Sequence, residues 1–154
     1  MATQKILVPY NFTAYEEKVL DFLIGTYANR EDIHITLFHG YTPLPVLDMD
    51  ASPEMRKLRS GMAFLSEELR RKEGGLKSAK KFLMENGFTD AQIEYIFRER
   101  KKPVAEEIIE TTIEGHFRVL VLSRQPGKVT RFFARSVHTR VLSALKGVTI
   151  CIPT

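Results

Sequence analysis

Six basic residues lie in segments that follow predicted strands, where their side chains could bind an anion. They are Arg100, Lys101, Arg124, Lys128, Arg131 and Arg135. Ser136, which we expect to begin a helix, would add a hydroxyl and the positive end of a helix dipole. A phosphate-bearing metabolite or a nucleic-acid backbone would fit such a site. The alternative is a solvated basic rim that pairs with Glu99 or Glu106, since charge runs are commonly exposed faces.

No other group of residues predicts catalysis or metal binding. The four histidines are scattered: His34 and His39 should face opposite sides of one strand, and the other two are isolated in sequence. Cys151 lies in an apolar stretch, which is typical of an unreactive thiol. Because no nucleophile has an evident base, we expect a non-enzymatic protein with no metal and no obligatory cofactor.

Length and charge narrow the possible classes of protein. The chain has 154 residues, which suits a single domain over 1–154, and a formal net charge of +4. This charge is uneven, since 116–154 holds seven basic and no acidic residues. So modest an overall charge does not favour a dedicated nucleic-acid binder. With one cysteine, no signal-peptide core and no apolar run near 20 residues, we expect a soluble cytoplasmic protein.

Five short apolar runs alternate with four helical patterns along the chain. The runs predict strands over 5–9, 33–39, 92–98, 119–122 and 148–153. The first run is too apolar for a strand with one solvated face, so we place it at the centre of the sheet. This alternation predicts a parallel sheet with helices on both faces. Ligands of such sheets bind beyond the carboxyl ends of the strands, where the basic residues fall.

Two helices carry specific expectations. Thr13 and Glu16 have the spacing of a capping box, in which the Thr13 hydroxyl accepts from the Glu16 amide and Glu16 reaches back. A long helical pattern over 52–86 would span about 50 Å if unbroken. Because that exceeds what a domain of this size can cover, we expect a break or bend at Gly74-Gly75. The last helix is predicted to begin at Ser136.

Several segments together resemble the universal stress protein family. Residues 6–13 are similar to its opening strand and 37–40 to its second strand. Residues 119–123 resemble its fourth strand, and 135–142 resemble its Gly-Ser-Val-x-x-x-Val-Leu element. The likeness covers nearly the whole chain. It implies an α/β fold with a five-stranded parallel sheet in the order 3-2-1-4-5, of the Rossmann-like universal stress protein type.

The resemblance does not extend to the family's ATP-binding residues. Binding members carry an acidic residue after the first strand and a Gly-x-x-Gly, nine-residue, Gly-Ser/Thr signature after the fourth. Here Asn11 takes the acidic position, Ser123, Pro126 and Arg135 stand for the glycines, and Arg100 replaces a further glycine after the third strand. Ser136 is retained, and Gly127 is a possible shifted substitute. We therefore expect no ATP binding in the family manner.

The resemblance also implies a dimer. In family members the last strands pair antiparallel across a two-fold axis, which here would bring together Val148, Ile150, Cys151 and Ile152 of two copies. The alternative is a short monomer edge that ends at Pro153.

These observations lead to one favoured function and two alternatives. We expect a regulatory, stress-response type of protein that acts as a homodimer through unknown protein partners. The first alternative is a nucleotide switch that holds ATP through Asn11, Gly40, Gly127 and Ser136, with Arg135 as phosphate clamp. The second is a basic rim that binds phosphometabolites or nucleic acid.

Overall fold

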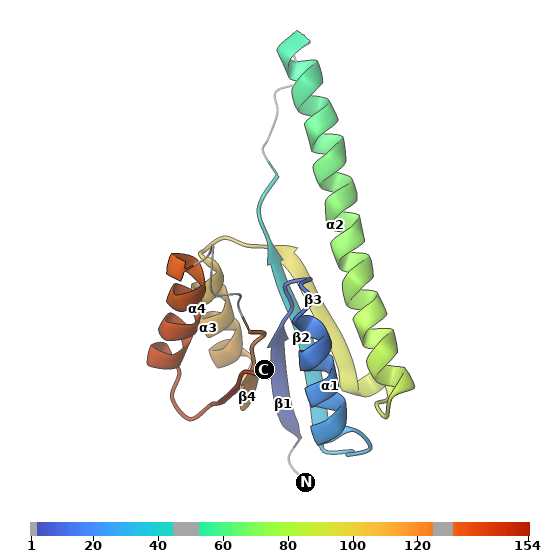
Figure 1. Ribbon diagram of the computed structural model, residues 1–154, viewed down its shortest axis with the longest axis vertical. Coiled ribbons are helices and arrows are strands. Elements are labelled where there is room, and N and C mark those ends of the chain that lie inside the picture. Colours follow the sequence, from blue (N-terminus) through green and yellow to red (C-terminus); the bar gives the residue numbers. More distant parts are fainter. Residues whose placement is uncertain (1–2, 45–52, 125–130) are drawn as a thin grey trace.

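The computed structural model describes residues 3–44, 53–124 and 131–154 and contains one five-stranded parallel sheet (Figure 1). The strands lie in the order β3-β2-β1-β4-β5, which confirms the predicted fold class and strand order. All neighbouring pairs are parallel. The strand bounds are β1 (Gln4–Pro9), β2 (Ile33–Tyr41), β3 (Ile93–Glu99), β4 (Val119–Val121) and β5 (Thr149–Cys151).

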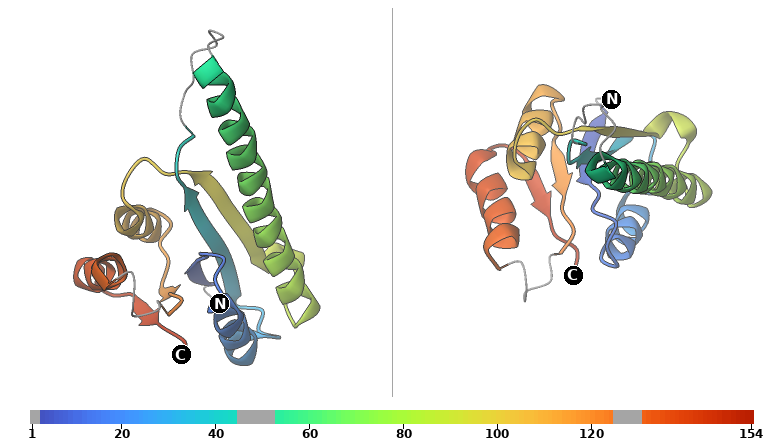
Figure 2. Two further views of the ribbon diagram at one scale, coloured as in Figure 1. Left: turned by 45° about the horizontal axis from the view of Figure 1, so that its top comes forward. Right: turned by 90° about the horizontal axis from the view of Figure 1, so that it is seen from above.

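Helices cover both faces of the sheet (Figure 2). They are α1 (Glu16–Tyr27), α2 (Pro53–Glu85), α3 (Val104–Glu114) and α4 (Arg131–Ala144), with a short 3-10 turn η1 (Asp90–Gln92) before β3. On one face α1 and α2 contribute Leu23 and Leu76 to a core cluster. On the other face α3 and α4 contribute Ile108 and Val141 to a second cluster. Within the described residues, no helix combines the length and apolar character needed to cross a membrane.

Strand β1 is the centre of this arrangement. Ile6 and Val8 point into the first cluster and Leu7 into the second, and all three are fully buried. The run of apolar residues is therefore explained by burial on both faces, as predicted.

Helix α1 begins with half of the predicted capping box. Glu16 does reach back, and its Oε2 accepts from the Thr13 amide at 3.0 Å. The Thr13 hydroxyl does not accept from the Glu16 amide, which instead donates to the Thr13 carbonyl at 3.1 Å. That hydroxyl donates to Glu16 Oε2 at 2.5 Å and accepts from the Tyr15 amide. The Thr13 hydroxyl therefore stabilises the loop before α1 and does not cap the helix.

The expected break at Gly74-Gly75 is wrong, because α2 runs unbroken from Pro53 to Glu85. Its predicted first residue, Ser52, lies outside the described residues. The helix is not covered along its whole length, as the prediction assumed: its N-terminal part projects beyond the sheet (Figure 1). Gly75 is accommodated by packing, since a Cβ there would lie 2.8 Å from Cε1 of Phe12. The buried residues Leu76 and Leu83 anchor the helix beyond the glycines.

The predicted start of the last helix is also wrong. α4 begins at Arg131, which makes Ser136 its sixth residue. No glycine or proline occurs between 131 and 144, so nothing in this stretch opposes helix formation.

The two adjacent glycines of α2 give a matched test of this packing. Gly74→Ala should raise the free energy of unfolding by about 0.5–1 kcal/mol, because nothing lies within 4 Å of the added Cβ and alanine favours helix. Gly75→Ala should instead be about 1–3 kcal/mol less stable than Gly74→Ala, because the methyl group meets the Phe12 ring. Urea unfolding measures both, and equal stabilisation by the two changes would contradict this packing.

Candidate functional site

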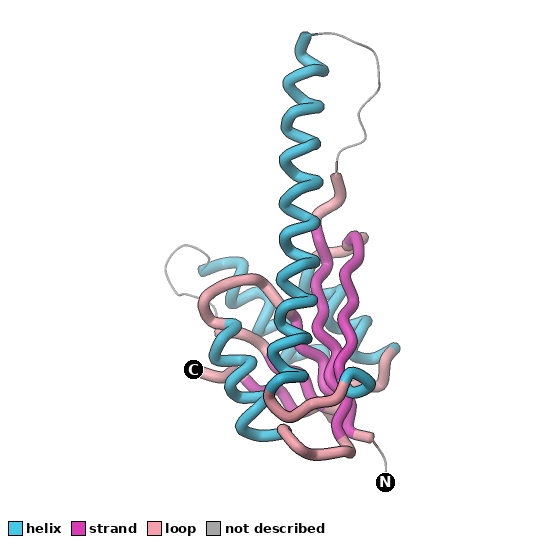
Figure 3. Tube along the Cα trace, turned by 90° about the vertical axis from the view of Figure 1, so that its right-hand side faces the viewer, coloured by secondary structure: helices cyan, strands magenta, loops and turns pink. Residues whose placement is uncertain are grey.

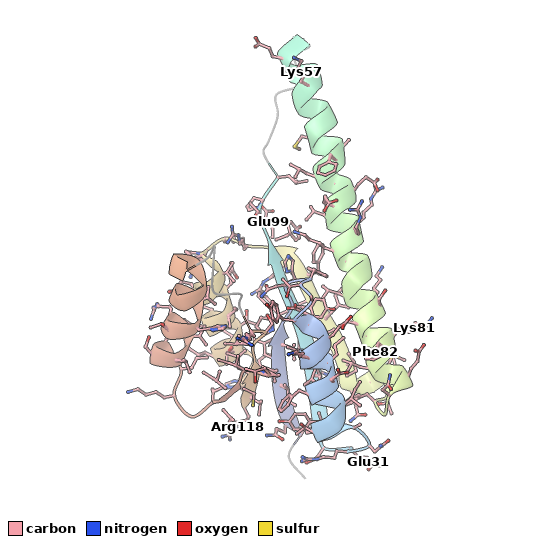
Figure 4. All side chains as sticks on the ribbon, in the orientation of Figure 1. Glu31, Lys57, Lys81, Phe82, Glu99 and Arg118 are labelled. Atoms are coloured by element: carbon pink, nitrogen blue, oxygen red, sulfur yellow. The ribbon has the colours of Figure 1, made fainter. Side chains whose placement is uncertain are left out.

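The carboxyl ends of the strands gather four of the predicted site residues into two pairs. Asn11, after β1, lies with its Nδ2 atom 3.5 Å from the buried Ser123 hydroxyl after β4. Gly40, in β2, adjoins Arg100 after β3, so that a Cβ on Gly40 would be 3.3 Å from Cβ of Arg100. The four residues thus share one edge of the sheet, as expected. In Figure 4 the labelled Glu99 marks this edge and Arg118 the opposite one.

The remaining predicted site residues lie in or near the loop before α4. Gly127 lies outside the described residues. Arg135 and Ser136 belong to α4, but their side chains lie outside the described part. Because Ser136 is not in the first turn of α4, its amide does not belong to the exposed N-terminal donors of this helix. The expectation that Ser136 offers a helix-start anion site is therefore wrong.

A buried carboxylate occupies the loop that follows β1. Glu16 is 2% exposed, and its Oε1 accepts from the Asn11 amide at 2.9 Å. Its Oε2 accepts from both the amide and the hydroxyl of Thr13. Between them lies Phe12, whose φ of 60° is uncommon for a large side chain. The backbone donors here, which could have held a phosphate, are engaged with the chain's own carboxylate.

A second buried carboxylate occupies the loop that follows β3. Oε1 of Glu107, in the first turn of α3, accepts from the amides of Lys101 at 2.7 Å and Lys102 at 3.1 Å. Arg98 lies 3.5 Å from its Oε2. Burial acts to raise the pKa of Glu107, but the two amide bonds and the Arg98 charge outweigh it and hold this pKa below its ordinary value. Glu107 is therefore ionised at neutral pH.

Several cations of this region already have partners. Arg100 donates to the Thr42 hydroxyl at 3.2 Å, and Lys102 pairs with Glu110. Arg140 pairs with Glu106 at 2.7 Å, one of the two carboxylates that the basic-rim alternative proposed as partners. Lys101 and Arg124 are exposed. The two ion-paired cations, Lys102 and Arg140, are not among the six basic residues of the expected site, and the hydroxyl partner of Arg100 leaves its positive charge uncompensated.

An aromatic cluster, which the sequence analysis missed, covers β1, β2 and β3 at the same edge. Phe12 contacts Tyr10 and His39 edge-on, each with ring centroids 4.9 Å apart. His39 stacks on Phe97 at 5.9 Å, and Phe97 also contacts Tyr41. The sequence did contain a signal for this cluster. Aromatic residues lie at the ends of three predicted neighbouring strands, and a glycine lies on the helix that packs over them.

His39 is held within this cluster as a neutral ring. Its Nδ1 lies 2.8 Å from the Tyr10 carbonyl, which requires that nitrogen to carry a proton. Burial lowers the pKa of His39, and the nearby charges of Lys72 and Arg100 act in the same direction. The cluster is thus a packed, uncharged surface beside the polar loops.

Metal and thiol chemistry find no support among the residues described. No group of three or more His, Cys, Asp or Glu side chains in that part of the chain could hold a metal ion. Burial raises the pKa of the Cys151 thiol, which disfavours the reactive thiolate.

Comparison with known proteins agrees with this architecture. The model of the universal stress protein family matches residues 2–150. The chain belongs to the universal stress protein family. A search of curated proteins finds no match.

Solved universal stress proteins share the fold at low sequence identity. Protein UspA from Lactobacillus plantarum is 12% identical with a TM-score of 0.68, covering 100% of this chain and 99% of its own. A universal stress protein in complex with cAMP is 17% identical with a TM-score of 0.62, covering 100% and 98%. One from Archaeoglobus fulgidus in complex with dAMP is 15% identical with a TM-score of 0.59, covering 100% of both chains.

The lowered pKa of Glu107 predicts an acid-sensitive contribution to stability. The unfolded chain binds this proton at the higher, ordinary glutamate pKa of about 4.3. The contribution of Glu107 is therefore present above that pH and is lost as pH falls through the lower pKa of the folded state. The free energy of unfolding, measured by urea unfolding at each pH, should fall less between pH 7 and pH 3 in Glu107→Gln than in the wild type.

Glu114→Gln is the matched control, because Glu114 is an exposed carboxyl on the same helix. This variant should keep the wild-type pH dependence. If Glu107→Gln also keeps it, the assignment of Glu107 as an ionised, buried acceptor is wrong.

Proposed function

We propose that this universal stress protein is a regulatory, stress-response type of protein that acts as a homodimer through partner binding. In this proposal it performs no catalysis and does not hold ATP through a glycine-loop site. The observation that carries the proposal is the engagement of the loop amides at the carboxyl edge by Glu16 and Glu107.

A triphosphate needs donors that are free before it binds. Phosphate sites of α/β proteins supply them as backbone amides in glycine-rich turns and at helix N-termini. Here the amides of Asn11, Thr13, Lys101 and Lys102 donate to buried carboxylates. A phosphate would have to displace an anion of the chain itself, and the displaced carboxylate would then be buried without its partners, at high cost. Ser123 does not allow a phosphate to approach the backbone as closely as a glycine would, because it carries a side chain, which is buried beside Asn11.

The proposed dimer uses the free edge of β5. The Thr149 amide donates to the Arg118 carbonyl, and the Cys151 carbonyl accepts from the Leu122 amide. Alternation along a strand therefore turns the amide and carbonyl of Ile150 away from β4, toward the open edge. Val148, Ile150 and Cys151 are half-buried, and Ile152 is 36% exposed. An antiparallel β5 from a second copy would satisfy this edge and cover these side chains.

Nucleotide content tests the ATP part of the proposal. Protein purified without added nucleotide and then denatured should release no adenine nucleotide, and titration of the native protein with magnesium-ATP should give no binding heat. Bound adenine nucleotide, or micromolar ATP affinity that Ser136→Ala removes, would contradict the proposal and favour the nucleotide switch.

A second candidate function is supported by two of the solved relatives, whose structures hold cAMP and dAMP. Each of these ligands presents one phosphate, which needs fewer donors than ATP. The pairs Asn11–Ser123 and Gly40–Arg100 would be the described part of such a site, with Gly127, Arg135 and Ser136 beyond it. Binding of cAMP or dAMP, weakened by Arg100→Ala, without binding of ATP would favour this candidate.

Ile150→Pro tests the β5 interface. Proline removes an amide that points outward and leaves the hydrogen bonds between β4 and β5 intact. Sedimentation at micromolar concentration should show a smaller assembly for this variant than for the wild type. Thr154→Lys, at the exposed chain end beyond β5, is the control and should keep the wild-type mass. An unchanged mass in Ile150→Pro would contradict pairing through β5.

A further inference from the structure

A cavity of about 370 Å³ lies between the C-terminal ends of α3 and α4. Two of its lining residues, Arg118 and Val148, directly precede β4 and β5, so it lies at the amino ends of these strands. The labelled Arg118 marks this edge in Figure 4, opposite the candidate functional site. The cavity has a volume within the range of small-molecule sites, roughly 300–1,000 Å³.

The inner wall of the cavity is apolar and continuous with the protein core. Phe117 and Leu145 are buried in the cluster between the sheet and helices α3 and α4, and Val148 packs against that cluster. Ile113, in the last turn of α3, also lines the cavity but is 58% exposed. A large apolar side chain in this state would gain burial from a ligand with an apolar body.

The rest of the lining is positively charged. His116, Arg118 and Lys146 line the cavity and are exposed, and no acidic residue lines it. Within the described part of the chain, none of these three side chains forms an ion pair. Glu114, the nearest carboxyl in the sequence, lines a neighbouring groove with Lys5 instead. The cavity therefore offers uncompensated positive charge beside an apolar wall.

Helix capping does not account for this positive charge. Cations near a helix C-terminus can stabilise its free carbonyls. In α3, however, the Phe117 amide donates to the Thr112 carbonyl at 3.0 Å, and the His116 amide donates to the Ile113 carbonyl at 3.2 Å. His116 takes the left-handed conformation of such a backbone cap, with a φ of 54°. The two full charges of an arginine and a lysine also exceed the half-charges, about −0.5 each, of two helix ends.

The donors at this cavity suit a carboxylate better than a phosphate held by backbone amides. The amides of His116 and Phe117 are engaged in the α3 cap, and the Arg118 amide donates to the Lys5 carbonyl at 2.9 Å. Recognition of an anion therefore falls to side chains. The planar guanidinium of Arg118 matches the two oxygens of a carboxylate, and the Lys146 ammonium adds a second positive charge.

We propose that this cavity binds a small amphipathic carboxylate, of the chemical class of medium-chain fatty acids. The apolar body lies against Ile113 and Phe117, and the carboxylate lies at Arg118 and Lys146. Val148 is the one lining residue shared with the proposed β5 interface. The site is separate from the carboxyl edge of the sheet and does not depend on the proposed function.

An amide NMR titration with octanoate tests the proposal, with acetate as the probe of charge alone and octanol as the probe of an apolar chain alone. Octanoate should shift the amide signals of Phe117 and Gly147 saturably and leave that of Gly40, at the opposite edge, unshifted. Octanoate should bind more than about tenfold more tightly than acetate, because each buried methylene group favours binding. Absence of octanoate binding, or equal affinity for acetate or octanol, would overturn the proposal.

Paired variants test which residues form the site. Replacing Arg118 and Lys146 together by glutamine should weaken octanoate binding by about fivefold or more, as expected for two partly solvated ion pairs. Lys77→Gln is the control and should not weaken it, because Lys77 is an exposed residue of α2, which covers the other face of the sheet (Figure 3). Unchanged affinity in the double variant would overturn the assignment of the carboxylate.

The apolar wall has a matched pair of its own. Ile113→Ser should weaken octanoate binding and leave acetate binding unchanged. Leu142→Ser is the control, because Leu142 is 54% exposed on α4 and does not line the cavity. Equal loss of octanoate binding in the two variants, or no loss in Ile113→Ser, would overturn the proposed position of the apolar body.

Discussion

Two buried carboxylates at the carboxyl edge of the sheet need hydrogen-bond donors, and this need determines how the loops after β1 and β3 are arranged. A charge removed from water is tolerated only where partners replace the water. Glu16 and Glu107 find these partners in the backbone amides of the loops that follow β1 and β3. Each carboxylate lies in the first turn of the next helix, where the helix dipole also favours negative charge. The same contacts therefore fix the loops and begin the helices.

This member of the universal stress protein family keeps the fold while four amides of the loops after β1 and β3 are engaged within the chain. Strand order and the two core clusters place the loop ends at one edge whatever their sequence. What that edge offers then depends on whether its amides are free. In the loops after β1 and β3, four amides are engaged by Glu16 and Glu107, and Tyr10, Phe12 and His39 pack together beside them. Under the proposed function, the protein therefore acts through its outer surfaces.

The parts of the fold set by local pattern could be predicted from the sequence. The fully apolar run at Ile6–Val8 indicated a central strand, and the alternation of runs and helices indicated the parallel sheet. The break at Gly74-Gly75 was wrong because helix propensity is a weak constraint when Leu76 and Leu83 are buried. The start at Ser136 was wrong because residues 131–135 contain no glycine or proline that would oppose an earlier helix start.

The candidate site was harder to predict, because its decisive contacts join residues that sequence spacing does not relate. Glu16 was identified through its capping box, but its bond to the Asn11 amide depends on the path of the loop through Phe12. In the sequence, nothing distinguishes Glu107 from the acidic residues that are common in the first turn of helices. Its role depends on how the chain turns between β3 and α3. The contact of Phe12 with Gly75 joins residues far apart in the sequence.

The most direct test of this account is an amide NMR titration of the protein with magnesium-ATP. The amides of Asn11, Thr13, Lys101 and Lys102 are the ones that donate to Glu16 and Glu107. The account predicts that these four signals are protected from hydrogen exchange and stay unshifted as ATP is added. Saturable shifts of these amides, with loss of their protection, would show that phosphate displaces the carboxylates and would contradict it.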